Sequence, residues 1–349
     1  MKKTAALSAF LLTAACGTQQ PLTAAEVRAA MPRSAVVSVN APDPGASAGA
    51  VRLASPGLAG GSSAATGNVV KAPIAVVSYV FATTINAGVI WALLPVTWFV
   101  DVVPPTRCDH DSCTWGPGSK PSELNDWKLV VTRAGDGYDW ALSGKPKSNP
   151  GAPFTAVLSG RAYPGALPAR GHGSFHADFD GAWAALDHAA GEVQQDFGSL
   201  AIDYDARAGV RVDATFLGAR NNDDPGAPAA NGFPNRTNAV YAFAADPAGA
   251  AGDLQLGFRN VAYDAGHAAA IDLTTKTLHT RWKAAGGRGD MVVKAPAPDN
   301  TAVSFSQCWD GAPDYGMTFD GTRAAGDPLR GDAGLCAYAD ALPVTIVVP

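Results

Sequence analysis

The sequence predicts a mostly β protein: one large antiparallel sheet, curved or shaped as a half-barrel, packed on one long apolar helix. The 349 residues include 38 glycines and 26 prolines, and only 16% of the chain is charged. This composition favours many strands joined by tight turns. After residue 125, short segments alternate between apolar and polar side chains, whereas one uncharged run, 72–100, has the length of a buried helix.

The first fifteen residues have the order of an export signal. A positive start, Met1–Lys3, precedes the apolar run Ala5–Ala15, which ends in small residues and is too short to span a bilayer. We therefore expect residues 1–15 to be a signal peptide that is cleaved from the mature protein.

Cys16 is the predicted site of lipid attachment. A cysteine directly after small residues resembles a bacterial lipobox, although Thr13 occupies the position where leucine is usual. The resemblance implies that the thiol receives diacylglycerol, and several acyl chains hold a protein stably on a membrane. Ordinary secretion with a free Cys16 thiol is the alternative. Gly17 favours the outer membrane, because an aspartate there would resemble an inner-membrane retention signal.

Residues 16–72 are predicted to be the lipidated cysteine and a disordered tether. The segment is rich in Ala, Ser, Gly and Pro and has almost no aromatic residue. Such a segment buries too little apolar surface to offset the entropy lost on ordering. Only Thr23–Met31 has the pattern of a helix. Residues 73–349 are then expected to form a single β-rich domain.

Four cysteines remain once Cys16 carries lipid, and an even number fits disulfides in an oxidising compartment. Three pairings are open, and we favour the local one because it closes two short loops. A zinc site is the alternative, but neither Cys-x4-Cys nor a gap of 27 residues has a familiar zinc spacing. The favoured pairs are Cys108–Cys113 and Cys308–Cys336.

The uncharged run Ala72–Val100 allows two structures. We favour a helix over about 74–94 that is buried against the sheet, because Ser78 and Asn86 place polar groups inside the run. Pro95 is expected to end this helix. A membrane span is the alternative, since the run is long enough to cross a bilayer.

Segments in which apolar and polar side chains alternate follow one another along the chain and are joined by short turns, as in successive hairpins. Trp127–Arg133 and Tyr138–Leu142 flank a turn, and Gly286–Gly289 is assigned to another turn because of its glycines. About a dozen mainly antiparallel strands result. The other predicted strands are Phe154–Ser159, Gly173–Phe179, Gly198–Tyr204, Val210–Leu217, Ala239–Ala244, Leu254–Tyr263, Ala269–Leu273, Leu278–Lys283, Asp290–Lys294, Ala302–Cys308, Gly316–Phe319 and Val344–Val348.

The sequence predicts no catalytic, cofactor-binding or metal site. His172 and His176 share one face of a predicted strand, but at roughly 3.3 Å per residue they lie about 13 Å apart, too far to share an ion. We interpret that face as solvated. Motifs of serine hydrolases, zinc proteases, phosphate loops and dinucleotide sites are missing, so only a dispersed Ser–His–Asp site stays open. A net charge of −5 without a basic cluster argues against nucleic acid.

Several short motifs resemble a group of uncharacterised exported lipoproteins of myxobacterial type. They are Asn86-Ala87, Pro104-Pro105-Thr106, Trp115-Gly116-Pro117 and the strand Trp127–Arg133. The resemblance covers roughly residues 74–180 and implies an exported lipoprotein, without supplying an activity. A buried helix followed by a long sheet is also similar in outline to lipoprotein-carrier and mycobacterial-type lipid-binding lipoproteins, which is an analogy of fold.

We therefore expect a non-catalytic, lipid-anchored envelope protein. Its expected partners are the membrane and a lipid or an apolar envelope protein, with no cofactor and no nucleic acid. A structural or adhesive surface protein is the alternative, with contacts through the loops at Cys108–Cys113 and Asn221–Asn235. A hydrolase with a dispersed site is the third candidate.

Overall fold

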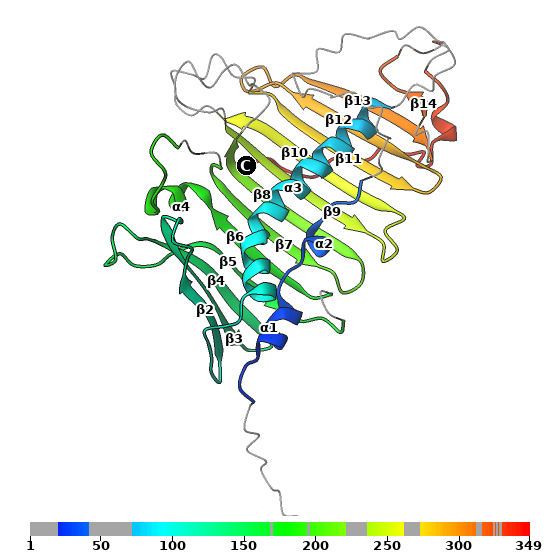
Figure 1. Ribbon diagram of the computed structural model, residues 1–349. Coiled ribbons are helices and arrows are strands. Elements are labelled where there is room, and N and C mark those ends of the chain that lie inside the picture. The colour runs from blue at the N-terminus through cyan, green and yellow to red at the C-terminus, as the bar shows by residue number, and fades with distance from the viewer. Residues whose placement is uncertain are drawn as a thin grey trace, which may run out of the picture.

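The computed structural model describes residues 20–41, 72–167, 170–192, 194, 196–220, 236–261, 273–311, 316–323, 325, 327 and 330–349. In these residues fourteen antiparallel strands form one uncurled sheet, and each strand pairs with its neighbours in sequence (Figure 1). The predicted fold, mostly β with one large antiparallel sheet packed on one long helix, is confirmed, although the sheet does not curl into the half-barrel that the sequence also allowed. The strands are β1 (Arg107–Cys108), β2 (Ser112–Gly118), β3 (Asn125–Ala134), β4 (Gly137–Pro146), β5 (Thr155–Tyr163), β6 (His172–Asp178), β7 (Ser199–Asp205), β8 (Val210–Arg220), β9 (Arg236–Ala245), β10 (Gly252–Val261), β11 (Thr275–Lys283), β12 (Gly286–Lys294), β13 (Ala302–Asp310) and β14 (Met317–Asp320).

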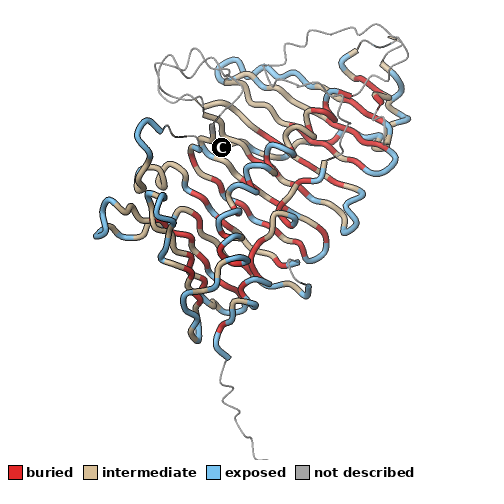
Figure 2. The backbone as a smooth tube through the Cα atoms, viewed as in Figure 1, coloured by how far each residue is buried: buried red, intermediate tan, exposed pale blue. Residues whose placement is uncertain are grey.

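The alternation of side chains gives the sheet two different faces. In β7, Leu200 and Ile202 are buried, whereas Ala201 and Asp203 are exposed. Successive side chains of a strand point to opposite faces, so the apolar positions line the face on which the helices pack. Figure 2 shows buried positions along the middle of the strands under these helices. We call this the apolar face and the opposite one the polar face.

The long helix α3 (Pro73–Val102) crosses the apolar face diagonally (Figure 1). At its start, the amide of Ile74 donates to the side chain of Gln307 on β13, 3.0 Å away. Just beyond its end, the carbonyl of Val103 accepts from the indole nitrogen of Trp115 on β2, 2.9 Å away. The helix is therefore fixed at both ends and lies along the sheet.

Pro95 does not end α3, contrary to the sequence prediction of a helix over about 74–94. The helix continues through this residue to Val102. Proline removes the hydrogen bond to the carbonyl of Trp91, one turn earlier. Both residues are exposed, so the freed carbonyl lies on the outer side of the helix, and buried side chains such as Val96 and Phe99 keep the last turns on the sheet.

The polar residues inside the uncharged run have specific partners. The hydroxyl of Ser78 lies 2.7 Å from that of Thr280 on β11, and both residues are buried. The side chain of Asn86 accepts from the amide of Val39 at 2.7 Å and donates to the carbonyl of the same residue at 2.9 Å. These bonds match the prediction of a helix packed within the domain.

Residues 20–41 differ from the predicted tether, because they fold against α3 and the sheet. The helix α1 (Ala24–Ala30) begins with a capping box between Thr23 and Glu26, and the short helix α2 (Ser34–Val37) follows. The pattern noticed at Thr23–Met31 thus corresponds to α1. Aliphatic side chains rather than aromatic ones supply the buried surface here: Leu22, Val27, Met31, Val37 and Val39 are fully buried.

Gly286–Gly289 was predicted to be a turn, but these glycines belong to β12. The turn lies just before them, at Ala284 and Ala285. Packing explains the glycines. A Cβ on Gly287 would lie 2.4 Å from the ring of Trp309, and a Cβ on Gly289 would lie 2.2 Å from Cγ2 of Ile74. Their absence of a side chain therefore lets a tryptophan and the first turn of α3 approach the strand.

The C-terminal residues 336–349, which we call the strap, cross the polar face (Figure 1). Val344–Val348 was predicted as a strand but lies outside the sheet. The strap begins at the disulfide to Cys308 on β13, and Thr345 then donates to the side chain of Gln255 on β10. Gly257 leaves room for it, since a Cβ there would lie 2.7 Å from Val348. In the strap, backbone groups that would pair with a neighbouring strand are hydrogen-bonded to side chains of the sheet instead.

Candidate functional site

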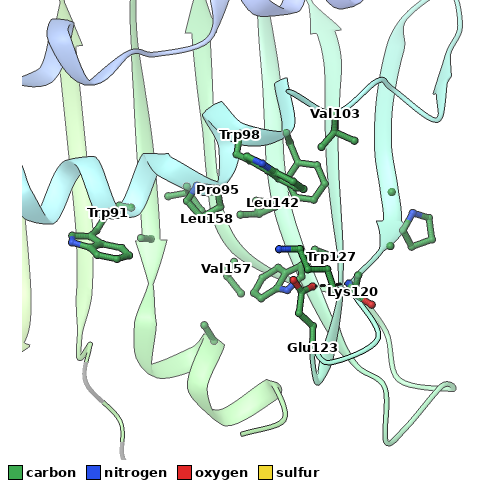
Figure 3. A pocket seen from close by; sticks show the side chains of 18 of the residues that line it. Trp91, Pro95, Trp98, Val103, Lys120, Glu123, Trp127, Leu142, Val157 and Leu158 are labelled. Carbon is green, nitrogen blue, oxygen red and sulfur yellow. Dashed lines mark hydrogen bonds between the residues drawn. The ribbon is translucent and has the colours of Figure 1, made fainter. Parts of the chain in front are cut away.

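An apolar cleft opens beside the C-terminal half of α3, over strands β2 to β6 (Figure 3). Its volume is about 820 Å³, which is within the range of small-molecule sites in proteins. Figure 3 shows Trp91 and Trp98 of α3 on one side and Trp127 of β3 on the other. The floor consists of aliphatic side chains from the sheet, namely Leu142, Val157, Leu158 and Ala177.

A short helix that the sequence did not predict forms a further wall of the cleft. β6 ends at Asp178, whose carboxylate accepts from the amide of Gly181 at 2.9 Å and so caps α4 (Phe179–Ala185). This is why the predicted strand Gly173–Phe179 ends one residue earlier. Phe179 and Ala182 of α4 line the cleft.

Two anchors hold α4 in place over the sheet. Near its start, Asp180 pairs with Arg236 on β9, with 2.6 Å between Oδ2 and Nη1. Just beyond its end, Asp187 exchanges two hydrogen bonds with Asn125 on β3, at 2.9 and 3.0 Å. The α4 wall of the cleft is therefore tied to β9 near its start and to β3 just beyond its end.

Polar groups gather at one mouth of the cleft. Lys120 and Glu123 lie beside Trp127, and the amide of Lys120 donates to the Glu123 carboxylate at 3.2 Å (Figure 3). Ser119 donates to Asp126 at 2.7 Å. An apolar floor with polar groups at one end suits a ligand that has an apolar chain and a polar head.

The predicted cysteine pairing is confirmed. Cys108 and Cys113 face each other across β1 and β2 and form one disulfide, while Cys308 and Cys336 form the other. Neither disulfide contributes to the cleft. Cys16 and the loop Asn221–Asn235 lie outside the described residues.

The histidines of the strand singled out in the sequence lie away from the cleft. His172 and His176 are on β6, on the face opposite the buried Phe175 and Ala177. The ring of His172 stacks on Tyr163 with 4.5 Å between centroids, and His176 is exposed. In the ranges that the structure covers, no group of three His, Cys, Asp or Glu side chains is arranged to hold a metal ion.

A pair formed by the buried His279 and the half-buried Asp253 lies on the polar face, remote from the cleft. The two ring nitrogens of His279 face a carboxylate oxygen of Asp253 at 2.8 Å and the carbonyl of Pro343 at 2.7 Å. A catalytic triad needs a nucleophile at one of those nitrogens. Since both positions are occupied by acceptors, the pair serves to attach the strap.

Comparison with known proteins gave no match: no family model, no curated protein and no solved structure is detectably similar to the chain. The cleft therefore has to be interpreted from its own residues.

The sequence did not reveal the cleft, because its walls come from segments far apart in the chain. Trp91, Trp127 and Ala182 converge only once α3 lies across the sheet. One signal was present: the second half of the uncharged run contains two tryptophans and a proline that a fully buried helix would not favour.

Proposed function

We propose that the protein is a non-catalytic lipoprotein of the cell envelope, anchored through Cys16, that holds the acyl chain of a lipid in the cleft beside α3. The observation that carries this proposal is the cleft itself, with three tryptophans and an aliphatic floor. Burial of apolar chain in such a site is favourable by about 0.8 kcal/mol for each methylene group.

The polar mouth supports an amphiphile rather than a wholly apolar ligand. The side chain of Lys120 is exposed at this mouth, while its carbonyl accepts from the ammonium group of Lys147 at 2.8 Å. The headgroup of a lipid whose chain lies on the floor would reach these groups and remain in contact with water.

The test is an analysis of non-covalent lipid carried by the purified full-length protein. Organic extraction followed by mass spectrometry separates such lipid from chains attached to Cys16, which stay with the protein. We expect the wild type to carry acyl lipid in stoichiometric amount. Ala182→Trp, which fills the cleft from α4, should remove most of it.

Ala184→Trp is the matched control, because Ala184 lies on the same helix, is exposed and does not line the cleft. This variant should carry as much lipid as the wild type. A wild-type protein without non-covalent lipid, or equal lipid content in both tryptophan variants, would contradict the proposal.

A further inference from the structure

We propose that the outer side of α3 rests on the surface of the lipid bilayer to which the protein is anchored. The inference rests on the proposed function, because it takes the anchor at Cys16 from it. It adds a second contact, made by side chains of the folded domain. The residues concerned form the outer stripe of α3: Ile90, Trp91, Leu94, Trp98 and Val102.

The outer stripe is unusual because large apolar side chains are exposed together on one helix. Trp91 is 74% exposed and Val102 is 66% exposed. The spacing of three or four residues puts the five side chains on neighbouring turns of one side. Exposed apolar patches of this kind mark contacts with a protein or a membrane.

The composition of the stripe favours a bilayer as its partner. Tryptophan is enriched where the apolar interior of a membrane meets water, because its ring is apolar and its N–H is polar. No charged residue interrupts α3 before Asp101, whose carboxylate pairs with Arg33. Among the described helices, α3 alone is long and apolar enough to cross a membrane by length and composition.

The N-terminal segment brings the start of the described chain close to the end of this stripe. The carbonyl of Gln20 accepts from Arg133 at 3.2 Å. Farther along, the guanidinium of Arg28 donates to the carbonyl of Val100 at 3.1 and 3.2 Å. Residues 20–33 thus connect the start of the described chain to the last turns of α3.

Few residues separate the start of the described chain from the proposed anchor. Cys16 precedes Gln20 by four residues, and four extended residues span at most about 14 Å. A lipid on Cys16 therefore holds the bilayer close to the C-terminal end of α3. Because Trp91 and Trp98 belong both to the outer stripe and to the cleft, the cleft opens toward the same surface.

The test introduces a tryptophan at a stripe position that does not line the cleft. Leu94 is 51% exposed and suits this purpose. The lipidated full-length protein is reconstituted into phosphatidylcholine vesicles whose acyl chains carry bromine, a short-range quencher of tryptophan fluorescence. We expect the emission added by Leu94→Trp to be mostly lost in brominated vesicles compared with unbrominated ones, and Val102→Trp to behave in the same way.

Leu335→Trp is the matched control, since Leu335 is 75% exposed but lies near the opposite edge of the sheet, close to β14. Its added emission should survive bromination. Equal survival at positions 94 and 335 would overturn the inference, and so would shielding of position 94 by a second copy of the chain in a dimer. If lipid is extracted from the wild type while position 94 is unquenched, the cleft stands and the membrane contact fails. If position 94 is quenched while no lipid is extracted from the wild type, the membrane contact stands and the lipid in the cleft fails.

Discussion

The Nε2 atom of His279 lies 2.8 Å from Oδ1 of Asp253, and this half-buried pair joins the strap to the polar face of the sheet. The other ring nitrogen lies 2.7 Å from the carbonyl of Pro343 in the strap. Both ring nitrogens of His279 are thus engaged, one by the sheet and one by the strap. The imidazole therefore bridges β10 and the strap.

Replacing His279 should destabilise the fold measurably. His279 is only 3% exposed, and His279→Ala removes both bonds while Asp253 keeps Arg281 as a partner. We expect a loss of about 1–3 kcal/mol in the free energy of unfolding in urea with the disulfides intact. His176→Ala, at an exposed position of β6, should change it by less than about 0.5 kcal/mol. Equal effects would show that His279 does not hold the strap.

The contribution of Asp253 should depend on pH. Burial raises the pKa of this carboxyl, but hydrogen bonds from His279 and Arg281 outweigh burial and hold the pKa below its ordinary value. Such a group stabilises the folded state above its unfolded pKa of about 4, and the stabilisation is lost as the pH falls through the folded value. Wild type and Asp253→Asn should therefore differ most in stability near neutral pH and converge in acid. A difference that stays constant from neutral pH into acid would contradict this assignment.

The contact between α3 and β11 can be tested by removing its two hydroxyls in turn. Ser78→Ala leaves the buried hydroxyl of Thr280 without this partner, at a cost of about 1–3 kcal/mol. The double variant Ser78→Ala/Thr280→Val removes both groups and should regain most of that loss. Ser78→Ala and Thr280→Val are also measured singly by urea unfolding. If the double variant lost the sum of the two single losses in stability, the hydroxyls would not interact.

Two glycines should respond to alanine in opposite directions. Gly289→Ala pushes a Cβ against Ile74 in the first turn of α3 and should cost about 1–3 kcal/mol through overpacking. The cost should shrink in an Ile74→Ala background, because the obstructing side chain is gone. Gly88→Ala meets nothing within 4 Å on α3 and should stabilise the protein by about 0.5–1 kcal/mol. Loss of stability in both glycine variants would contradict the packing described for α3.

Period-two patterns predicted most of the sheet, because local alternation alone decides which face of a strand is buried. Trp127–Arg133, for instance, lies within β3. The errors came from segments whose structure depends on distant neighbours. Glycines at Gly286–Gly289 are explained by Trp309 and Ile74, and Val344–Val348 alternates like a strand but lies across strands on the polar face.

Other features could not be predicted because they arise only in the assembled fold. The segment 20–41 lacks aromatic residues, yet aliphatic side chains such as Val27 are buried against α3 and the sheet. The cleft depends in the same way on α3 crossing the strands. The pairing of Cys308 with Cys336, in contrast, was predictable because it is local and the parity of the cysteines favoured disulfides.

An acyl chain in the cleft can be located by photo-crosslinking. The full-length protein is incubated with a fatty acid that carries a diazirine on its chain, irradiated, and mapped by peptide mass spectrometry. We expect adducts on cleft-lining peptides from the second half of α3, β5 and α4, and their loss in Ala182→Trp but not in Ala184→Trp. Adducts confined to the strap or the polar face, or none at all, would contradict this expectation.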